Sequence, residues 1–173
     1  MFNKLLLPIF IVSLLVSACG FQPLYAKRAN SSGEIATTNQ LLASVQVESI
    51  ENREGQILRN LLLDRLNSDY ESAPIKYHLT SKISITTSGL GVQSDDTTNR
   101  NKLTVTAQFN LIGSKKNRKF YITQISSYSE TESEYPALVA KQDAINRNLR
   151  EIANDAKIRI SLFLELDRNS EQP

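Results

Sequence analysis

The chain contains a single cysteine, Cys19, and a single histidine, His78. A cysteine thiol is a soft nucleophile that can form a disulfide, bind a metal, act in catalysis or accept a covalent group. A disulfide within the chain is excluded because there is no second cysteine. No nucleophile motif surrounds either residue, and these two side chains do not make up a zinc ligand set. A structural or catalytic role for Cys19 is therefore disfavoured, and its thiol is available to accept a covalent group.

The residues before Cys19 have the pattern of a secretory signal. Residues 1–4 carry one positive charge, residues 5–16 are nearly all apolar, and Ser17 and Ala18 are small. A charged start, a short apolar core and small residues at the cleavage point are typical of such a signal. A transmembrane helix is the alternative, but a span needs about 20 apolar residues. The apolar run is shorter than that, and Pro8 interrupts it.

The sequence LVSAC, which ends at Cys19, resembles the lipobox of bacterial lipoproteins. In that family a diacylglycerol is attached to the thiol, the signal peptidase cuts before the cysteine, and the new amino group is acylated, commonly with palmitate. The resemblance implies that Cys19 is the lipidation site, with no other cofactor. Several acyl chains together hold a protein firmly on a membrane. Gly20 in place of Asp favours export to the outer membrane, by resemblance to lipoprotein sorting rules.

The overall charge argues against one class of partner. Lys and Arg number 20 and Asp and Glu number 18, so the formal net charge is +2 at pH 7. A general nucleic-acid binder would carry a strong basic excess. We therefore expect no nucleic-acid partner. The net charge does not exclude a local basic patch.

The pattern of apolar residues predicts one folded domain between two polar segments. Alternation with a period of two predicts strands within 43–50, 75–86, 101–112 and 119–128, and helical spacing predicts helices over 52–67 and 135–164. The expected organisation is a lipoprotein signal peptide (1–18), a lipidated N terminus with a flexible linker (19–42), a single α+β domain (43–166) and a disordered tail (167–173).

The order of these elements predicts a two-layer α+β sandwich. The first two strands are joined through a helix and should be parallel, by a right-handed crossover. The last three strands should form an antiparallel meander, which gives a four-stranded mixed sheet. Each long strand has one apolar and one polar side, so both helices should cover the same face. His78 falls on the polar side and is expected to be a surface residue.

Acidic residues do not form a recognisable catalytic or metal site. Glu130, Glu132 and Glu134 alternate and could be read as a metal cluster, but no His or Cys completes a ligand set. Asp95 and Asp96 lack the spacing of a calcium loop. We expect no enzyme activity, no catalytic residues and no bound metal.

A basic cluster lies at the turn between the last two strands. Its members are Lys115, Lys116, Arg118 and Lys119, while Arg100 is expected at the opposite end of the preceding strand. The cluster could be a solvated turn, or it could contact anionic lipid phosphates or acidic protein loops. Because side chains in a turn contribute little to folding, replacing Lys115, Lys116 and Arg118 by serine is expected to leave stability nearly unchanged.

The stretch CGFQPLY, residues 19–25, resembles the "CGF-x-PLY" start of the LptE family of lipopolysaccharide-assembly lipoproteins. The family's element order is similar to the one predicted above. The resemblance implies an outer-membrane lipoprotein on the periplasmic side that plugs the LptD β-barrel and helps it assemble. It also implies possible contact with lipopolysaccharide, for which the basic cluster and Arg100 are the candidate residues.

Two other classes remain open at this point. The chain could be a generic periplasm-facing lipoprotein, such as an adaptor or a secretion pilotin, without a role in lipopolysaccharide transport. It could also be a lipid-anchored carrier of small apolar ligands, which would need an internal cavity.

Overall fold

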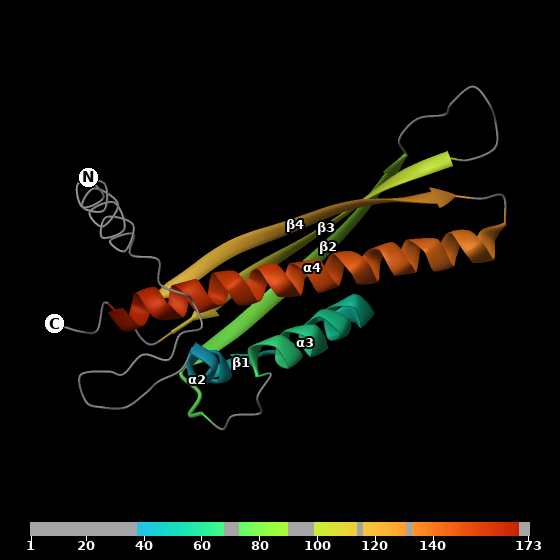
Figure 1. Cartoon of the computed structure of the whole chain (residues 1–173). Coiled ribbons are helices and arrows are strands. Elements are labelled where there is room, and N and C mark those ends of the chain that lie inside the picture. Colours follow the sequence, from blue (N-terminus) through green and yellow to red (C-terminus); the bar gives the residue numbers. More distant parts are fainter. Residues whose placement is uncertain (1–37, 68–72, 90–98, 114–115, 131–132, 170–173) are drawn as a thin grey trace, which may run out of the picture.

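The computed structural model describes residues 38–67, 73–89, 99–113, 116–130 and 133–169 (Figure 1). The expected signal peptide, Cys19, the CGFQPLY stretch and Lys115 lie outside the described residues.

The described elements follow one another in the order expected, with one addition at the start. They are α2 (Thr38–Ala43), β1 (Val45–Val47), α3 (Asn52–Leu66), β2 (Tyr77–Gly89), β3 (Asn99–Ile112), β4 (Asn117–Glu130) and α4 (Glu134–Asn169). β3 and β4 begin two residues before the predicted ranges, and β2 and β4 end beyond them, because alternation fades into polar residues there. β2 begins two residues later than predicted, at Tyr77.

The predicted fold class is confirmed. The sheet has the order β1-β2-β3-β4. β1 runs parallel to β2, while β2 with β3 and β3 with β4 are antiparallel. Figure 1 shows α3 and α4 on the same face of this sheet, as the one-sided apolar pattern predicts. The result is a two-layer α+β sandwich.

The core lies between that face and the two helices. Phe109 of β3 is fully buried at its centre and stacks on Phe120 of β4, with ring centroids 5.0 Å apart. α3 contributes Leu58 and Leu62, and both are completely buried. Burying a large apolar side chain contributes about 1.5–3 kcal/mol each, so this layer fixes the position of the sheet relative to the helices.

Gly55 is required by the close approach of α3 to the segment that precedes it. A Cβ atom at this position would lie 2.7 Å from Cγ2 of Ile50 and 2.9 Å from its carbonyl oxygen. Gly55 is buried. The glycine that costs helix propensity in the first turn therefore allows Ile50 to pack under α3.

The folded part begins earlier and ends later than predicted. The short helix α2 starts at Thr38, inside the segment expected to be a linker, and its Leu42 is buried. The hydroxyl of Thr38 donates to Glu165 Oε1 of α4 at 3.1 Å. α4 itself continues to Asn169, so residues 167–169 are helical and do not belong to a disordered tail.

No helix within the described part of the chain is both long enough and apolar enough to cross a membrane. α4 has 36 residues, which corresponds to about 54 Å of helix. It runs the whole length of the sheet (Figure 1).

Candidate functional site

The turn between β3 and β4 places the basic cluster next to the C-terminal end of α4. The backbone N–H of Gly113 donates to the carbonyl oxygen of Lys116 at 3.1 Å, which closes the turn. A Cβ atom at Gly113 would come within 2.9 Å of the Tyr77 ring. The turn is therefore held close to the start of β2 and to α4.

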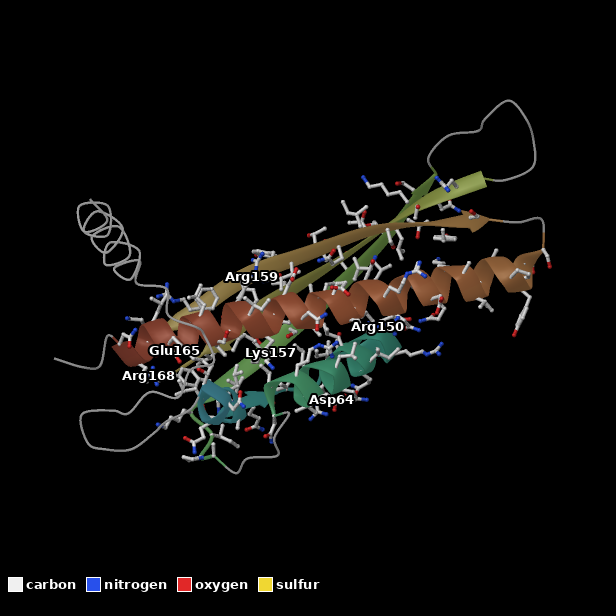
Figure 2. All side chains as sticks on the ribbon, viewed as in Figure 1. Asp64, Arg150, Lys157, Arg159, Glu165 and Arg168 are labelled. Carbon is white, nitrogen blue, oxygen red and sulfur yellow. The ribbon has the colours of Figure 1, made fainter. Side chains whose placement is uncertain are left out.

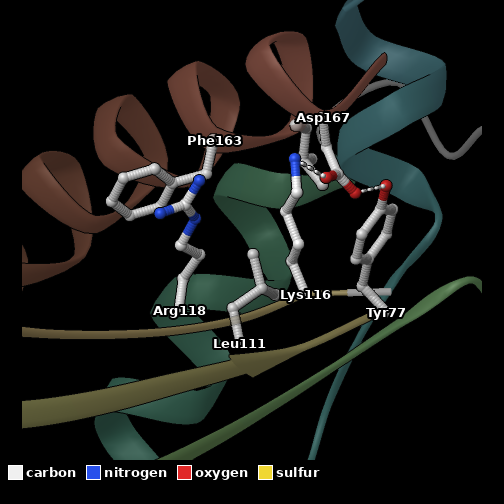
Figure 3. A pocket seen from close by; sticks show the side chains of 7 residues that line it. Tyr77, Leu111, Lys116, Arg118, Phe163 and Asp167 are labelled. Atoms are coloured by element: carbon white, nitrogen blue, oxygen red, sulfur yellow. Dashed lines mark hydrogen bonds and ion pairs between the residues drawn. The ribbon is translucent and has the colours of Figure 1, made fainter. Parts of the chain in front are cut away.

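Lys116 is part of a tether between the turn and α4. Its Nζ lies 3.7 Å from Oδ1 of Asp167, and the Tyr77 hydroxyl donates to Oδ2 of the same carboxylate at 3.1 Å (Figure 3). Asp167 is mostly shielded, with 18% of its side chain exposed, against 47% for Lys116. Asp167 falls in the segment predicted to be a disordered tail, and it instead joins three elements.

Arg118 also contacts the helix. Its guanidinium carbon lies 5.8 Å from the centre of the Phe163 ring, within the range of a cation–π contact (Figure 3). Phe163 in turn packs against Phe120 at 5.5 Å between ring centroids. Alternation along β4 explains this placement, because Arg118 shares a parity with the buried Phe120 and Ile122.

The other members of the candidate set point the opposite way. The strand pairing sets Lys119 opposite Asn110, and Arg100 opposite Ser129. Both cations are exposed, and both lie on the sheet face that α3 and α4 leave uncovered. They lie at opposite ends of β3, as predicted.

We call this uncovered face the bare face. Its side chains are those of β2, β3 and β4 that alternate with the core residues: His78, Thr80, Lys82, Ser84, Thr86 and Ser88; Arg100, Lys102, Thr104, Thr106, Gln108, Asn110 and Ile112; and Lys119, Tyr121, Thr123, Ile125, Ser127 and Ser129.

The bare face is polar and positively charged. Its charged side chains are Lys82, Arg100, Lys102 and Lys119, and this described set contains no Asp or Glu. Hydroxyl groups dominate the rest. His78 lies at the β1 end, where its Nδ1 is 2.9 Å from Oε1 of Glu48, and it is exposed as predicted.

Three large apolar side chains interrupt this polar surface, and one of them, Ile112 at the end of β3, is 36% exposed. Tyr121 is 58% exposed and Ile125 is 59% exposed, and both belong to β4. Their side of the sheet follows from position along β4, because odd-numbered residues alternate with the buried Phe120 and Ile122, although polar and apolar residues do not alternate strictly in this segment. Neither Tyr121 nor Ile125 is among the candidates predicted from the sequence.

Neither described hollow resembles an internal ligand cavity. The crevice at the basic turn has a volume of about 10 Å³, close to the minimum for one water molecule. A shallow hollow of about 410 Å³ lies between the end of β4 and the start of α4. It is lined by Ser127, Tyr128, Ser129, Pro136, Ala140, Asp143 and Arg147.

The described residues can bind anionic or polar groups. They contain no group of three or more His, Cys, Asp or Glu side chains arranged to hold a metal ion. Exposed ammonium, guanidinium and hydroxyl groups on the bare face can donate hydrogen bonds to phosphate or carboxylate oxygens, and such contacts are charge-assisted.

Comparison with solved structures finds proteins of similar fold. A crystal structure described as a lipoprotein from Caulobacter crescentus CB15 matches with a TM-score of 0.56 and 24% identity, over 75% of this chain and 96% of that one. Rare lipoprotein B from Shewanella oneidensis matches with a TM-score of 0.47 and 17% identity, over 73% and 100% of the two chains. The first likeness supports the fold alone.

The sequence itself identifies the family. No curated protein matches the chain. The family model described as "LptE: Lipopolysaccharide-assembly" matches residues 42–160, which covers the sheet, α3 and most of α4. The chain therefore belongs to the LptE family of lipopolysaccharide-assembly proteins.

Proposed function

We propose that the mature protein is an outer-membrane lipoprotein that plugs an LptD-type β-barrel, helps that barrel to assemble and contacts lipopolysaccharide. Membership of the LptE family supports a role in lipopolysaccharide assembly. The lipobox and the CGFQPLY stretch support an acylated Cys19 as the anchor, on the periplasmic side of the outer membrane.

The observation that carries the proposal is the bare face. A sheet face without apolar cover suits a wet surface, and the lumen of a transmembrane barrel is polar. The bare face presents hydroxyls and cations along all three long strands. It can therefore form hydrogen bonds to a barrel wall without exposing the core.

The candidate lipid contacts divide into two groups. Lys116 and Arg118 hold the turn to α4, through Asp167 and Phe163. Lys119 and Arg100 are exposed on the bare face. We assign the contact with the anionic head group of lipopolysaccharide first to Lys119 and Arg100, because their charges are directed away from the folded core.

Gentle detergent extraction tests the barrel partnership. The full chain carries an affinity tag at its C terminus, and the retained proteins are identified by mass spectrometry. We expect a large outer-membrane barrel to be retained in near-equal amount. A lipid-modified chain recovered from the outer membrane without a barrel would instead favour the generic adaptor or pilotin.

A second arm tests lipid contact by measuring lipopolysaccharide binding in low salt. The variant Arg100→Ser/Lys119→Ser should bind lipopolysaccharide several-fold more weakly and still retain the barrel. A matched exposed control on the bare face is Thr86→Ser/Ser127→Ala, which changes no charge. If both variants bind lipopolysaccharide equally well, the cations of the bare face do not form the lipid site.

A further inference from the structure

Within the part of the chain that the structure describes, no further strand pairs with the outer edge of β4. β4 is the last strand of the described sheet and pairs there with β3, from Asn117 to Glu130. Its sequence contains no proline, and its charged residues are confined to the two ends of the strand, Arg118 and Lys119 near the start and Glu130 at the last position. Long edge strands of folded proteins are usually guarded by prolines, bulges or charges, because an unguarded edge pairs with other strands.

One hydrogen bond identifies which backbone groups point outward. Nη1 of Arg159 donates to the carbonyl oxygen of Tyr121 at 3.1 Å, from the side of α4 that faces β4 (Figure 2). In an antiparallel strand, residues that direct N–H and C=O to one side alternate with residues that direct them to the other. The odd-numbered residues from Lys119 to Ser129 therefore present their backbone groups to the open edge and their side chains on the bare face.

The exposed apolar side chains on this edge are placed symmetrically. Tyr121 and Ile125 lie two residues before and two residues after Thr123. When two copies of β4 pair antiparallel with Thr123 opposite Thr123, Tyr121 of each copy lies opposite Ile125 of the other. The pair of molecules therefore contains this contact twice. Pairs of an aromatic and a β-branched side chain are among the favourable cross-strand pairs.

In other registers, Tyr121 and Ile125 do not face each other. Centring on residue 121 or 125 pairs only one of them with itself. Centring on 122 or 124 sets Tyr121 or Ile125 against Thr123 of the second copy. The register about Thr123 also avoids like charges, because Lys119 then faces Ser127 and Arg118 faces Tyr128.

The adjoining part of α4 is compatible with this pairing. Gln124 donates to Asp155 at 3.1 Å, so the turn of α4 from Asp155 to Arg159 lies beside Thr123. Ile158 of this turn is 54% exposed. The carbonyl oxygen of Tyr121 has a second lone pair, so it can accept from a strand while Arg159 remains bound.

We propose that two copies of this chain pair through their β4 edges, antiparallel and centred on Thr123, to form a continuous sheet across both molecules. The pairing concerns the protein outside any complex, and it does not depend on the barrel partnership proposed above.

A cysteine substitution tests the register in the full-length, membrane-anchored chain. Thr123→Cys should form a disulfide-linked pair, because opposed residues on neighbouring strands lie about 5.5 Å apart and disulfides span such distances. Ser127→Cys is the matched control on the same strand and face. Its two copies would lie about 27 Å apart, at 3.4 Å per residue. Co-expression of Lys119→Cys with Ser127→Cys should restore the link.

Charge exchange gives an independent readout without disulfides. Thr123→Lys alone and Thr123→Glu alone should each be monomeric by gel filtration in detergent, since like charges would face each other across the symmetry axis. A mixture of the two should form a heterodimer. The proposal would be overturned if Thr123→Cys and Ser127→Cys cross-link equally. It would also be overturned if the mixture of Thr123→Lys with Thr123→Glu remains monomeric.

Discussion

Replacing Lys116 and Arg118 together by serine should destabilise the fold measurably. The pair between Lys116 and Asp167 is partly exposed, and such pairs contribute about 0.2–1 kcal/mol. The cation–π contact of Arg118 with Phe163 contributes about 0.5–1 kcal/mol at a similarly exposed site. The expected loss is therefore about 1–2 kcal/mol. In a domain of this size, about 1 kcal/mol lowers the melting temperature by roughly 4 °C.

The matched variant removes the same amount of positive charge from the bare face, on the other side of the sheet. Arg100→Ser/Lys119→Ser removes two exposed cations of the bare face. Surface substitutions of this kind usually change stability by less than about 0.5 kcal/mol. The two variants have the same net charge, so a difference between them reports the contacts with α4.

Thermal unfolding of the full chain, followed by far-UV circular dichroism in detergent, measures both variants. We expect the Lys116→Ser/Arg118→Ser variant to melt about 4–8 °C below the parent, and the Arg100→Ser/Lys119→Ser variant to melt within about 2 °C of it. This differs from the expectation drawn from the sequence, in which every cation of the turn is dispensable for folding. Equal melting temperatures for all three proteins would refute the structural role given to Lys116 and Arg118.

Gly55→Ala should lose about 1–3 kcal/mol of unfolding free energy in urea, because its Cβ would overlap Ile50, including the backbone carbonyl; an unchanged urea midpoint would contradict that contact. Phe109→Ala should lose about 3–5 kcal/mol in the same assay, and a loss below about 1 kcal/mol would mean that Phe109 is not at the centre of the core. Cys19→Ala should leave an uncut precursor without acyl chains; metabolic labelling of this variant with a fatty acid would exclude Cys19 as the lipidation site.

The fold could be predicted because its signals are periodic and local. Alternation over β2, β3 and β4 marked both the core residues and the bare face, and the helix between β1 and β2 indicated their parallel pairing. The start of α2 escaped prediction because six residues are too few to show a helical period. Thr38 is fixed by a distant partner, Glu165, which no local pattern reveals.

The candidate site was harder to predict because a charge cluster in sequence need not be a cluster in space. Lys116, Arg118 and Lys119 are neighbours in the chain, yet Lys119 lies on the bare face while Arg118 contacts Phe163. The alternation of β4 contained this information, since Arg118 has the parity of Phe120. The partnership of Lys116 with Asp167 was not accessible, because the polar residues after Leu164 read as a tail until Tyr77 and the turn are placed beside them.

Site-specific photo-crosslinking from the bare face tests the central claim most directly. Gln108 lies on β3, the middle strand of the meander, and its side chain belongs to the bare face. A photoreactive amino acid at Gln108, irradiated in living cells that express the full chain, should trap a large outer-membrane β-barrel, with no product when light is omitted. A correctly localised protein that gives no barrel adduct from Gln108 would contradict the claim that this face lies against a barrel wall.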